Sequence, residues 1–295
     1  MKYFIIGILT AFFTVTTAFS KKEKELKVRI NSVLEGKKAT VGVAVLYENN
    51  RLFELNKGNY PMMSVCKFPL ALAVLDYLQK NNLSLDTEIF IRKSDLLPDT
   101  YSPLRDRYPL GNIKISIRKL LFYTVSLSDN NTCDILFRYI GGTKVVDNYI
   151  KQLGISGMSV IATEAMMHEA FEKQYSNTAT PSSAVLLLGK FLKEELFRNE
   201  YRDYLKKIMI ETTTGNDKIK AGLPNEVIIG HKTGSSDRSA KGIKAGDNDL
   251  AFVQLPDGKQ YCITVFVRDS KEDDKTNADI IATISKIVYD YIAEK

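Results

Sequence analysis

The hydrophobic pattern divides the chain into two strand-rich ends and a helical middle. Residues 22–35 place apolar side chains at helical spacing and stop at Gly36, which predicts an amphipathic helix. The β-rich runs 41–47 and 51–55 flank a short polar turn and predict a hairpin. Near the other end, the pattern predicts three strands followed by a closing helix, at residues 226–229, 250–254, 261–267 and about 280–291. We therefore expect the two ends to share one sheet.

The middle of the chain is mostly helical in its periodicity. Helices are predicted at 67–80, 117–126, 130–140, 143–152, 182–195 and 200–213. This gives one domain, 21–295, with an α/β lobe of residues 21–58 and 215–295 and a helical lobe of residues 59–214. The stretch 155–181 lacks strong periodicity, so we expect a long ordered loop, and loops of that length are usually functional.

The first twenty residues are typical of a secretory signal. Lys2 supplies a positive charge, residues 4–15 are apolar, and small residues at 18–20 suit a cleavage site. A transmembrane segment is the alternative, but the run is short and interrupted by threonine, and a charged segment follows it. We expect an exported, periplasmic protein that leaves the membrane after cleavage and is monomeric.

Composition narrows the chemistry. The formal net charge of +6 helps to attract small anions, but no basic and aromatic stripe argues for nucleic acid. Only His168 and His231 are present, too few for a convincing zinc site, and we expect no cofactor. The three cysteines are Cys66, Cys133 and Cys262. They are either small buried hydrophobic residues or, for the first two, a disulfide, and the sequence leaves both open.

Three short motifs carry the chemistry. In Ser64-Val65-Cys66-Lys67, a serine stands three residues before a lysine, so on a helix the amine can reach the hydroxyl. Ser128-Asp129-Asn130 and Lys232-Thr233-Gly234 follow in that order. A lone S-x-x-K is common, but the set of three resembles the serine penicillin-recognising enzymes. Glu164, within the long loop, matches the deacylating glutamate of the class A serine β-lactamases.

The resemblance implies a fold and an activity. The fold is that of β-lactamases and transpeptidases, an α/β (α+β) class with a five-stranded antiparallel sheet flanked by the terminal helices, a helical lobe, and the active site between the lobes. The activity is hydrolysis of penicillins and cephalosporins through an acyl-enzyme. The alternatives are a D-alanyl-D-alanine peptidase and a penicillin sensor that stays acylated, and Glu164 argues against both.

The resemblance also implies roles for individual residues. Ser64 is the nucleophile, and the backbone N–H groups of Ser64 and Ser235 form the oxyanion hole. Either Lys67 or Glu164, acting through a water, is the acylation base. Ser128 passes a proton to the leaving nitrogen, and Asn130 binds the substrate side-chain amide. The substrate carboxylate is bound by the segment Lys232, Thr233, Gly234 and Ser235.

Several positions depart from common family members and are similar to the PER/VEB-like extended-spectrum subgroup. The ion pair that clamps the loop is missing, because Ala162 and Asn177 occupy its positions, and His168 replaces the usual asparagine. Residues 236–242 form an insertion after the third motif. These changes predict a wide entrance that accepts oximino-cephalosporins. His168 either hydrogen-bonds the hydrolytic water or is an ordinary polar residue.

Three further positions affect substrate binding. Asn248 aligns with an arginine that supports carboxylate binding in other members, and Lys218 is a candidate replacement. A lysine keeps the charge but lacks the bidentate fork, and a solvated lysine is the alternative. Tyr101 matches the aromatic gate of the family, with simple packing as the alternative.

Overall fold

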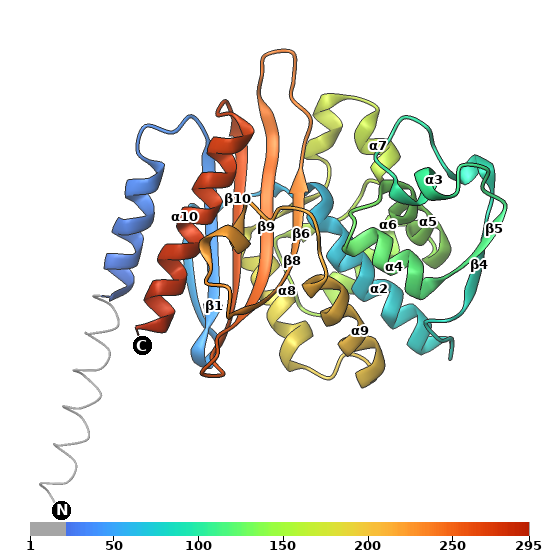
Figure 1. Cartoon of the computed structure of the whole chain (residues 1–295), viewed down its shortest axis with the longest axis horizontal. Coiled ribbons are helices and arrows are strands. Elements are labelled where there is room, and N and C mark those ends of the chain that lie inside the picture. The colour runs from blue at the N-terminus through green and yellow to red at the C-terminus, as the bar shows by residue number, and fades with distance from the viewer. Residues whose placement is uncertain (1–21, 295) are drawn as a thin grey trace, which may run out of the picture.

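The computed structural model describes residues 22–294, and its centre is a five-stranded antiparallel sheet. The strand order is β2-β1-β10-β9-β8. The strands are β1 Thr40–Tyr47, β2 Arg51–Leu55, β8 Ile228–Ser235, β9 Lys244–Gln254 and β10 Gln260–Ser270. Both ends of the chain contribute to this sheet, which confirms the predicted fold class (Figure 1).

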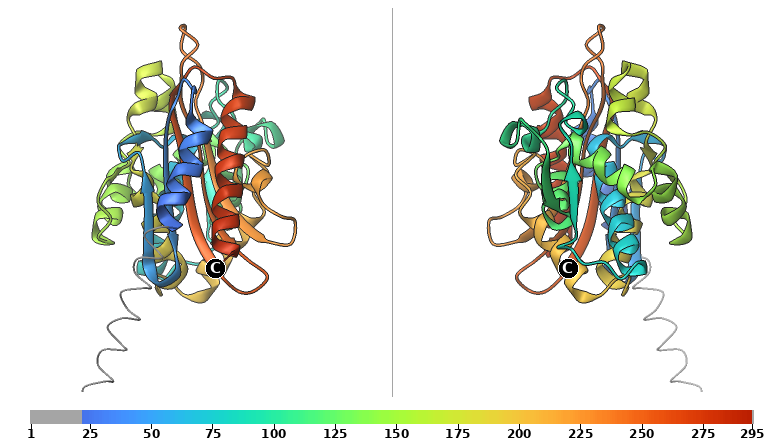
Figure 2. Two further views of the ribbon diagram at one scale, coloured as in Figure 1. Left: turned by 90° about the vertical axis from the view of Figure 1, so that its left-hand side faces the viewer. Right: turned by 90° about the vertical axis from the view of Figure 1, so that its right-hand side faces the viewer.

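The sheet is buried on both faces because its central strands alternate between two hydrophobic clusters. Val43 and Val45 join Ile263 and Val265 on one face, under the helix of residues 22–34 and α10, Asp274–Ala293. Side chains that alternate with them along a strand point to the opposite face, where they pack against the helical lobe. Figure 2 shows the two terminal helices side by side on one face.

The helical lobe is built around α2, Lys67–Lys80. Residues are buried all around this helix, as expected for the core helix of a lobe. The helices around it are α3 Pro103–Arg107, α4 Ile117–Val125, α5 Asn130–Ile140, α6 Thr143–Gln152, α7 Glu164–His168, α8 Pro181–Lys193 and α9 Asn199–Ile210. Since α2 begins at Lys67, the last residue of the first motif, the lobe's core fixes the position of Ser64.

Short elements complete the structure and were missed by sequence reasoning. They are the strands β3 Tyr60–Pro61, β6 Met158–Ser159 and β7 Thr178–Ala179 in one small sheet, β4 Glu88–Ile91 and β5 Ile113–Ser116 in another, and the 3-10 helices η1 Glu48–Asn50, η2 Met63–Cys66, η3 Lys93–Asp95, η4 Phe171–Tyr175 and η5 Ile219–Gly222. The predicted loop 155–181 therefore contains α7, η4 and two short strands. Periodicity cannot reveal elements of two to five residues.

The predicted and observed strand bounds differ most at β8 and β9. The sequence predicts strands 226–229 and 250–254, whereas the structure extends them to Ile228–Ser235 and Lys244–Gln254. The added residues include Lys232, Thr233 and Gly234, which have little β propensity as a group but pair with β9. The hairpin of residues 236–243 between them projects beyond the sheet (Figure 1).

The predicted signal segment, residues 1–20, lies outside the described residues. Among residues 22–294, no helix combines the length and the apolar character needed to cross a membrane.

Candidate active site between the sheet and the helical lobe

Ser64 lies in the turn η2, directly before α2, rather than inside the α-helix itself. The preceding Met63 has a left-handed backbone, with φ of 51°. Strand β8 comes very close to this turn at Gly234, where a Cβ atom would stand 2.5 Å from Met62 O and 2.9 Å from Ser64 N. Only glycine permits that approach, and it brings the start of the Ser235 segment beside the nucleophile.

Lys67 is at the centre of the site. Its Nζ lies 2.9 Å from Ser64 Oγ, 2.9 Å from Ser128 O and 2.6 Å from Asn130 Oδ1. It also lies 2.9 Å from Glu164 Oε1, a contact of charges whose angles are poorer than those of a hydrogen bond. Burial, the largest single influence, lowers the pKa of Lys67, but the Glu164 carboxylate together with the neighbouring Cys133 and Cys66 outweighs it and leaves that pKa above its ordinary value. The group is therefore an ammonium in the free protein.

Ser128 joins the two lysines. It has a left-handed backbone, with φ of 58°, and its Oγ accepts a hydrogen bond of 2.9 Å from Lys232 Nζ. The neighbouring Asp129 caps α5 by accepting from Thr132 N at 2.9 Å. It also accepts from Leu104 N at 2.7 Å, so its role is structural.

Lys232 has a lowered pKa, in contrast to Lys67. Its side chain is fully buried and donates to Ser128 Oγ and, at 2.8 Å, to Thr233 O. Burial, and then the positive charge of Lys67, lower the pKa of Lys232 to about 7. Of the two buried lysines at the site, Lys232 is thus the one whose pKa is lowered.

Glu164 begins α7 and is held there by a carboxylate that sequence reasoning missed. Asp134 accepts hydrogen bonds from Glu164 N at 2.7 Å and from Ala165 N at 2.9 Å. Burial is the main cause that raises the pKa of Asp134 to about 6. Asp134 stands four residues after Asn130 on α5, so both side chains lie on the same face of the helix. This spacing was the signal in the sequence that placed Asp134 near the site.

The loop that carries Glu164 is clamped by Asn177 instead of an ion pair. The side-chain oxygen of Asn177 accepts from Ile161 N at 2.8 Å and from Ala162 N at 2.9 Å. Its amide nitrogen donates to Ala162 O at 2.8 Å. Asn177 O also accepts from Met62 N at 2.8 Å, so the loop is tied to the segment before the nucleophile.

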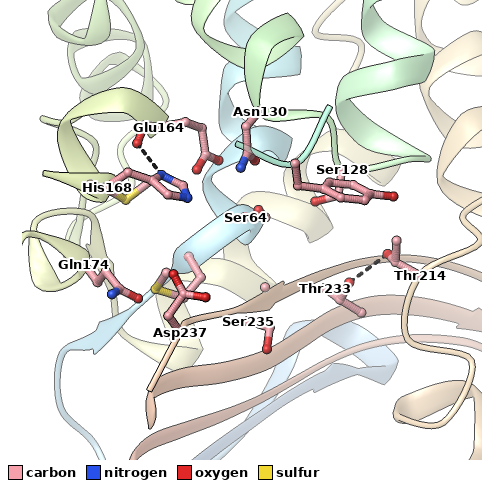
Figure 3. Close-up of a pocket in the computed structure, with 14 residues that line it drawn as sticks. Ser64, Ser128, Asn130, Glu164, His168, Gln174, Thr214, Thr233, Ser235 and Asp237 are labelled. Atoms are coloured by element: carbon pink, nitrogen blue, oxygen red, sulfur yellow. Dashed lines mark hydrogen bonds between the residues drawn. The ribbon is translucent and has the colours of Figure 1, made fainter. Parts of the chain in front are cut away.

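The ring of His168 is oriented by Glu164. Its Nδ1 lies 2.8 Å from the backbone oxygen of Glu164, which can only accept, so Nδ1 carries the proton. Nε2 is then an acceptor on a ring that borders the cavity (Figure 3). The ring can thus hold a water molecule near Glu164.

These residues surround a cavity of about 270 Å³, the catalytic cavity. Figure 3 shows Glu164, Asn130 and His168 on one side of Ser64, and Thr233 and Ser235 on the other. The cavity is lined by Met63, Ser64, Tyr101, Ser128, Asn130, Glu164, Met167, His168, Gln174, Thr214, Thr233, Gly234, Ser235 and Asp237. Sequence reasoning missed Met63, Met167, Gln174, Thr214 and Asp237, because their residue types have no chemical signature of their own.

Lys218 is not among the residues that line this cavity. Its ammonium is buried against the carboxylate of Asp247 on β9. Lys244 Nζ lies 3.6 Å from Oδ2 of the same carboxylate. Asn248 is buried as well, and its amide donates to Pro61 O at 2.7 Å and to Met62 O at 3.2 Å. Asn248 therefore holds the backbone before the nucleophile, whereas the Lys218 side chain is paired with a carboxylate.

The three cysteines are free and buried. The thiols of Cys66 and Cys133 contact each other beside Lys67, and burial raises the pKa of the Cys133 thiol. Of the two alternatives from the sequence, the structure has the free thiols. Within residues 22–294, no group of three or more histidine, cysteine, aspartate or glutamate side chains is arranged to hold a metal ion.

Comparisons with known proteins agree with this geometry. The model of the beta-lactamase enzyme family matches residues 25–292. Beta-lactamase VEB-1 of Pseudomonas aeruginosa is 40% identical over 100% of this chain and 99% of its own length. The crystal structure of TLA-1 extended spectrum beta-lactamase is 51% identical, with a TM-score of 0.89, covering 91% of this chain and 98% of that one. The crystal structure of a class A beta-lactamase from Bacteroides cellulosilyticus DSM 14838 is 49% identical, with a TM-score of 0.90, covering 93% of this chain and 99% of that one.

Proposed function

This chain belongs to the class A β-lactamases, with relatives of the PER/VEB type, and we propose how its own residues divide the work of hydrolysing β-lactam antibiotics. The membership decides against the peptidase and the sensor that the motifs alone left open. The substrates are small β-lactam molecules. The single observation that carries the proposal is that Lys67 Nζ lies 2.9 Å from both Ser64 Oγ and Glu164 Oε1.

In acylation, Ser64 Oγ attacks the lactam carbonyl carbon. Lys67 is already an ammonium paired with Glu164, so it has no free lone pair to accept the serine proton. Glu164 therefore takes the proton through a bridging water, and Lys67 stabilises the developing alkoxide by hydrogen bonding. Of the two candidates for the acylation base that the sequence left open, Lys67 and Glu164, we therefore propose Glu164.

The oxyanion is stabilised by the backbone N–H groups of Ser64 and Ser235. The close approach of β8 at Gly234 supports this, because it places the two segments side by side. Ser236 N donates to Gly246 O at 2.9 Å, which fixes the strand just beyond Ser235. Such a preorganised donor contributes roughly 3 kcal/mol to the transition state.

The leaving nitrogen receives its proton from Ser128 Oγ, which is 2.9 Å from Lys232 Nζ. The C–N bond breaks as the proton arrives, and Lys232 stabilises the Ser128 oxygen left behind. The proton that Glu164 took from Ser64 then passes through Lys67 to Ser128, so Glu164 is a carboxylate again before deacylation. Lys232, Thr233 and Ser235 bind the substrate carboxylate. That anion raises the pKa of Lys232 from its low value in the free enzyme, so binding and protonation reinforce each other.

Deacylation uses Glu164 again. It removes a proton from a water molecule held between its carboxylate and His168 Nε2, and the hydroxide attacks the ester carbon. The bond to Ser64 Oγ then breaks, and the serine regains its proton. Asp134 and Asn177 act as positioning residues, since they hold the helix and loop that carry Glu164.

Three features around the entrance of the catalytic cavity bear on the size of the substrates. The loop is clamped by Asn177, the hairpin of residues 236–243 projects beside the entrance, and Tyr101 is exposed at the rim. We propose hydrolysis of oximino-cephalosporins, supported by relatives named as extended-spectrum enzymes. Cefotaxime turnover no faster than a control without enzyme contradicts this.

The experiment that tests the residue roles compares three proteins with nitrocefin. The native enzyme turns it over, Glu164→Gln accumulates a covalent adduct seen by intact mass spectrometry, and Ser64→Ala forms no adduct. An adduct on Ser64→Ala means that the nucleophile is another residue. Rapid steady turnover by Glu164→Gln contradicts the role of Glu164.

Export and assembly state remain predictions. Residues 1–20 are expected to be removed on export to the periplasm, which the N-terminal mass of the mature protein tests. A monomer without membrane attachment is expected, which light scattering of the mature protein tests.

A further inference from the structure

A second cavity adjoins the catalytic cavity at Glu164. This adjoining cavity has a volume of about 300 Å³ and lies between residues 97–100, the start of α5 and the helix α7. Asn130, Glu164 and His168 line both cavities. They therefore form a shared wall, at which the two spaces meet.

The wall is held in place by hydrogen bonds. Asn130 accepts from Lys67 Nζ at 2.6 Å and donates to Thr100 Oγ1 at 2.8 Å. His168 is fixed through Nδ1 to the backbone of Glu164. Glu164 thus borders the adjoining cavity while its Oε1 pairs with Lys67 in the catalytic one.

The lining of the adjoining cavity is acidic. Asp99, Asp134, Glu164 and Glu169 contribute carboxylates, and no lysine or arginine of the described chain lines it. A β-lactam carries a carboxylate of its own, which this lining repels. At the outer rim, Asp99, Ala165 and Glu169 are exposed, so the cavity opens to solvent. The charge of this lining therefore disfavours the substrate.

The catalytic cavity cannot easily supply water once it is acylated. Pockets for drug-sized ligands measure roughly 300–1,000 Å³, and the catalytic cavity has about 270 Å³. A bulky acyl group on Ser64 therefore fills it and covers Glu164 from that side. Each turnover nevertheless consumes one water molecule at Glu164.

We infer that the adjoining cavity is a solvent route that delivers the hydrolytic water to Glu164 while the acyl group fills the catalytic cavity. This rests on the proposed role of Glu164 in deacylation. The water oxygen bonds to the acyl carbon, its proton goes to Glu164, and the ester bond to Ser64 Oγ breaks. His168 borders both spaces and orients the water as it passes.

Narrowing the outer rim tests the route. Asp99→Trp and Ala165→Trp obstruct it from opposite sides, and neither residue contacts substrate in the proposed mechanism. Asp99→Ala removes the charge without adding bulk, and Asp203→Trp adds the same bulk on the distant α9. Thermal melting confirms that each variant is folded, and two independent rim variants guard against misfolding of one.

The readout is the split between acylation and deacylation, measured with a cephalosporin that has a bulky oximino side chain and with a penicillin that has a small one. We expect the tryptophan variants to lower kcat for the bulky substrate about threefold to tenfold, with kcat/KM unchanged because KM falls in parallel. Acyl-enzyme should accumulate in quenched samples. The small substrate, which leaves room for water, should be affected less, and both control variants should behave like the native enzyme.

Two results overturn the inference. If kcat and kcat/KM are unchanged in folded tryptophan variants, water reaches Glu164 by another way. If kcat/KM falls for the bulky substrate alone, the adjoining cavity receives the substrate side chain instead. Either result is compatible with a trapped adduct on Glu164→Gln, so failure of the route is distinguishable from failure of the proposed function.

Discussion

Lys67 Nζ lies 2.9 Å from Glu164 Oε1, and neither side chain is appreciably exposed. A buried ion pair of this kind fixes the protonation state of both partners, because removing the proton from the lysine would leave the carboxylate unpaired. The pair therefore assigns the roles: Glu164 accepts protons, and Lys67 donates hydrogen bonds.

Glu164→Gln should change the role of Lys67. Without the carboxylate, burial and the charge of Lys232 lower the pKa of Lys67, so the neutral amine becomes available as the acylation base. Acylation should persist and increase with pH as Lys67 loses its proton. Stopped-flow acylation rates from pH 5 to 10 measure this, and a rate that is independent of pH in the variant argues against it.

The pH dependence of the native enzyme should reveal Lys232. Its pKa in the free enzyme is about 7, so carboxylate binding is lost as pH rises through that value. We expect kcat/KM to fall above about pH 7, while the corresponding limb of kcat lies at higher pH because bound substrate holds the proton. Lys232→Arg keeps its charge, so its kcat/KM should show no such limb. Persistence of the limb in that variant assigns it to another group.

Asp134 should make stability depend on pH. The folded protein holds its proton up to about pH 6, whereas an unfolded aspartate releases it near pH 4. The folded state thus binds more protons in this window, so stability is highest at its acidic end and falls as pH rises through 6. Denaturant unfolding of the native protein and Asp134→Asn at pH 4 and 7 measures the difference, which should be smaller in the variant.

Asp134→Ala should also impair deacylation. It leaves the N–H of the buried residue Glu164 without its acceptor, at a cost of about 1–3 kcal/mol, while the N–H of the exposed Ala165 can turn to water. Because α7 then moves, kcat should fall more than the rate of acylation. Equal effects on both steps indicate general destabilisation rather than positioning of Glu164.

Asn177→Asp tests the amide clamp. A carboxylate can still accept from Ile161 and Ala162, but it cannot donate to Ala162 O and repels that oxygen. We expect a loss of about 1–3 kcal/mol in the free energy of unfolding, measured with urea. A variant as stable as the native protein shows that the loop is held elsewhere.

Lys218→Gln should have a small effect on substrate binding. The charge of Lys218 is paired with Asp247 and does not line the catalytic cavity, so KM should change by less than about threefold, below the loss expected for a direct charged contact. A larger rise in KM, with the fold intact, indicates that Lys218 reaches the substrate carboxylate.

The sequence predicted the parts of the site that depend on local spacing. Ser64 and Lys67 meet because they stand three positions apart, and the hairpin of β1 and β2 follows from alternating residues around a turn. The order of strands and helices predicted that the two ends share one sheet, whereas the fold class came from the family resemblance. The lobe boundaries stay predictions, since α8 packs against strands of the sheet although the sequence assigned it to the helical lobe.

Contacts between distant segments could not be predicted in the same way. Asp134 reaches a loop 30 residues away, and Lys218 reaches Asp247 across 29 residues, so neither partner is visible in local periodicity. Asn177 was recognised only as the absence of an ion pair, and its hydrogen bonds required coordinates. The protonation of Lys67 depends on the balance between its burial and the groups around it, Glu164 foremost, which no spacing reveals.

The most direct test of the central claim is an NMR titration of Lys67 in the native enzyme without substrate. Lysine side chains labelled with ¹³C at Cε and ¹⁵N at Nζ report the pKa of each amine, and the Lys67 signal is identified by its loss in Lys67→Arg. The account predicts an ammonium that titrates above the ordinary lysine value of about 10.4. A Lys67 amine that is already neutral at pH 7 contradicts it and makes Lys67 the acylation base.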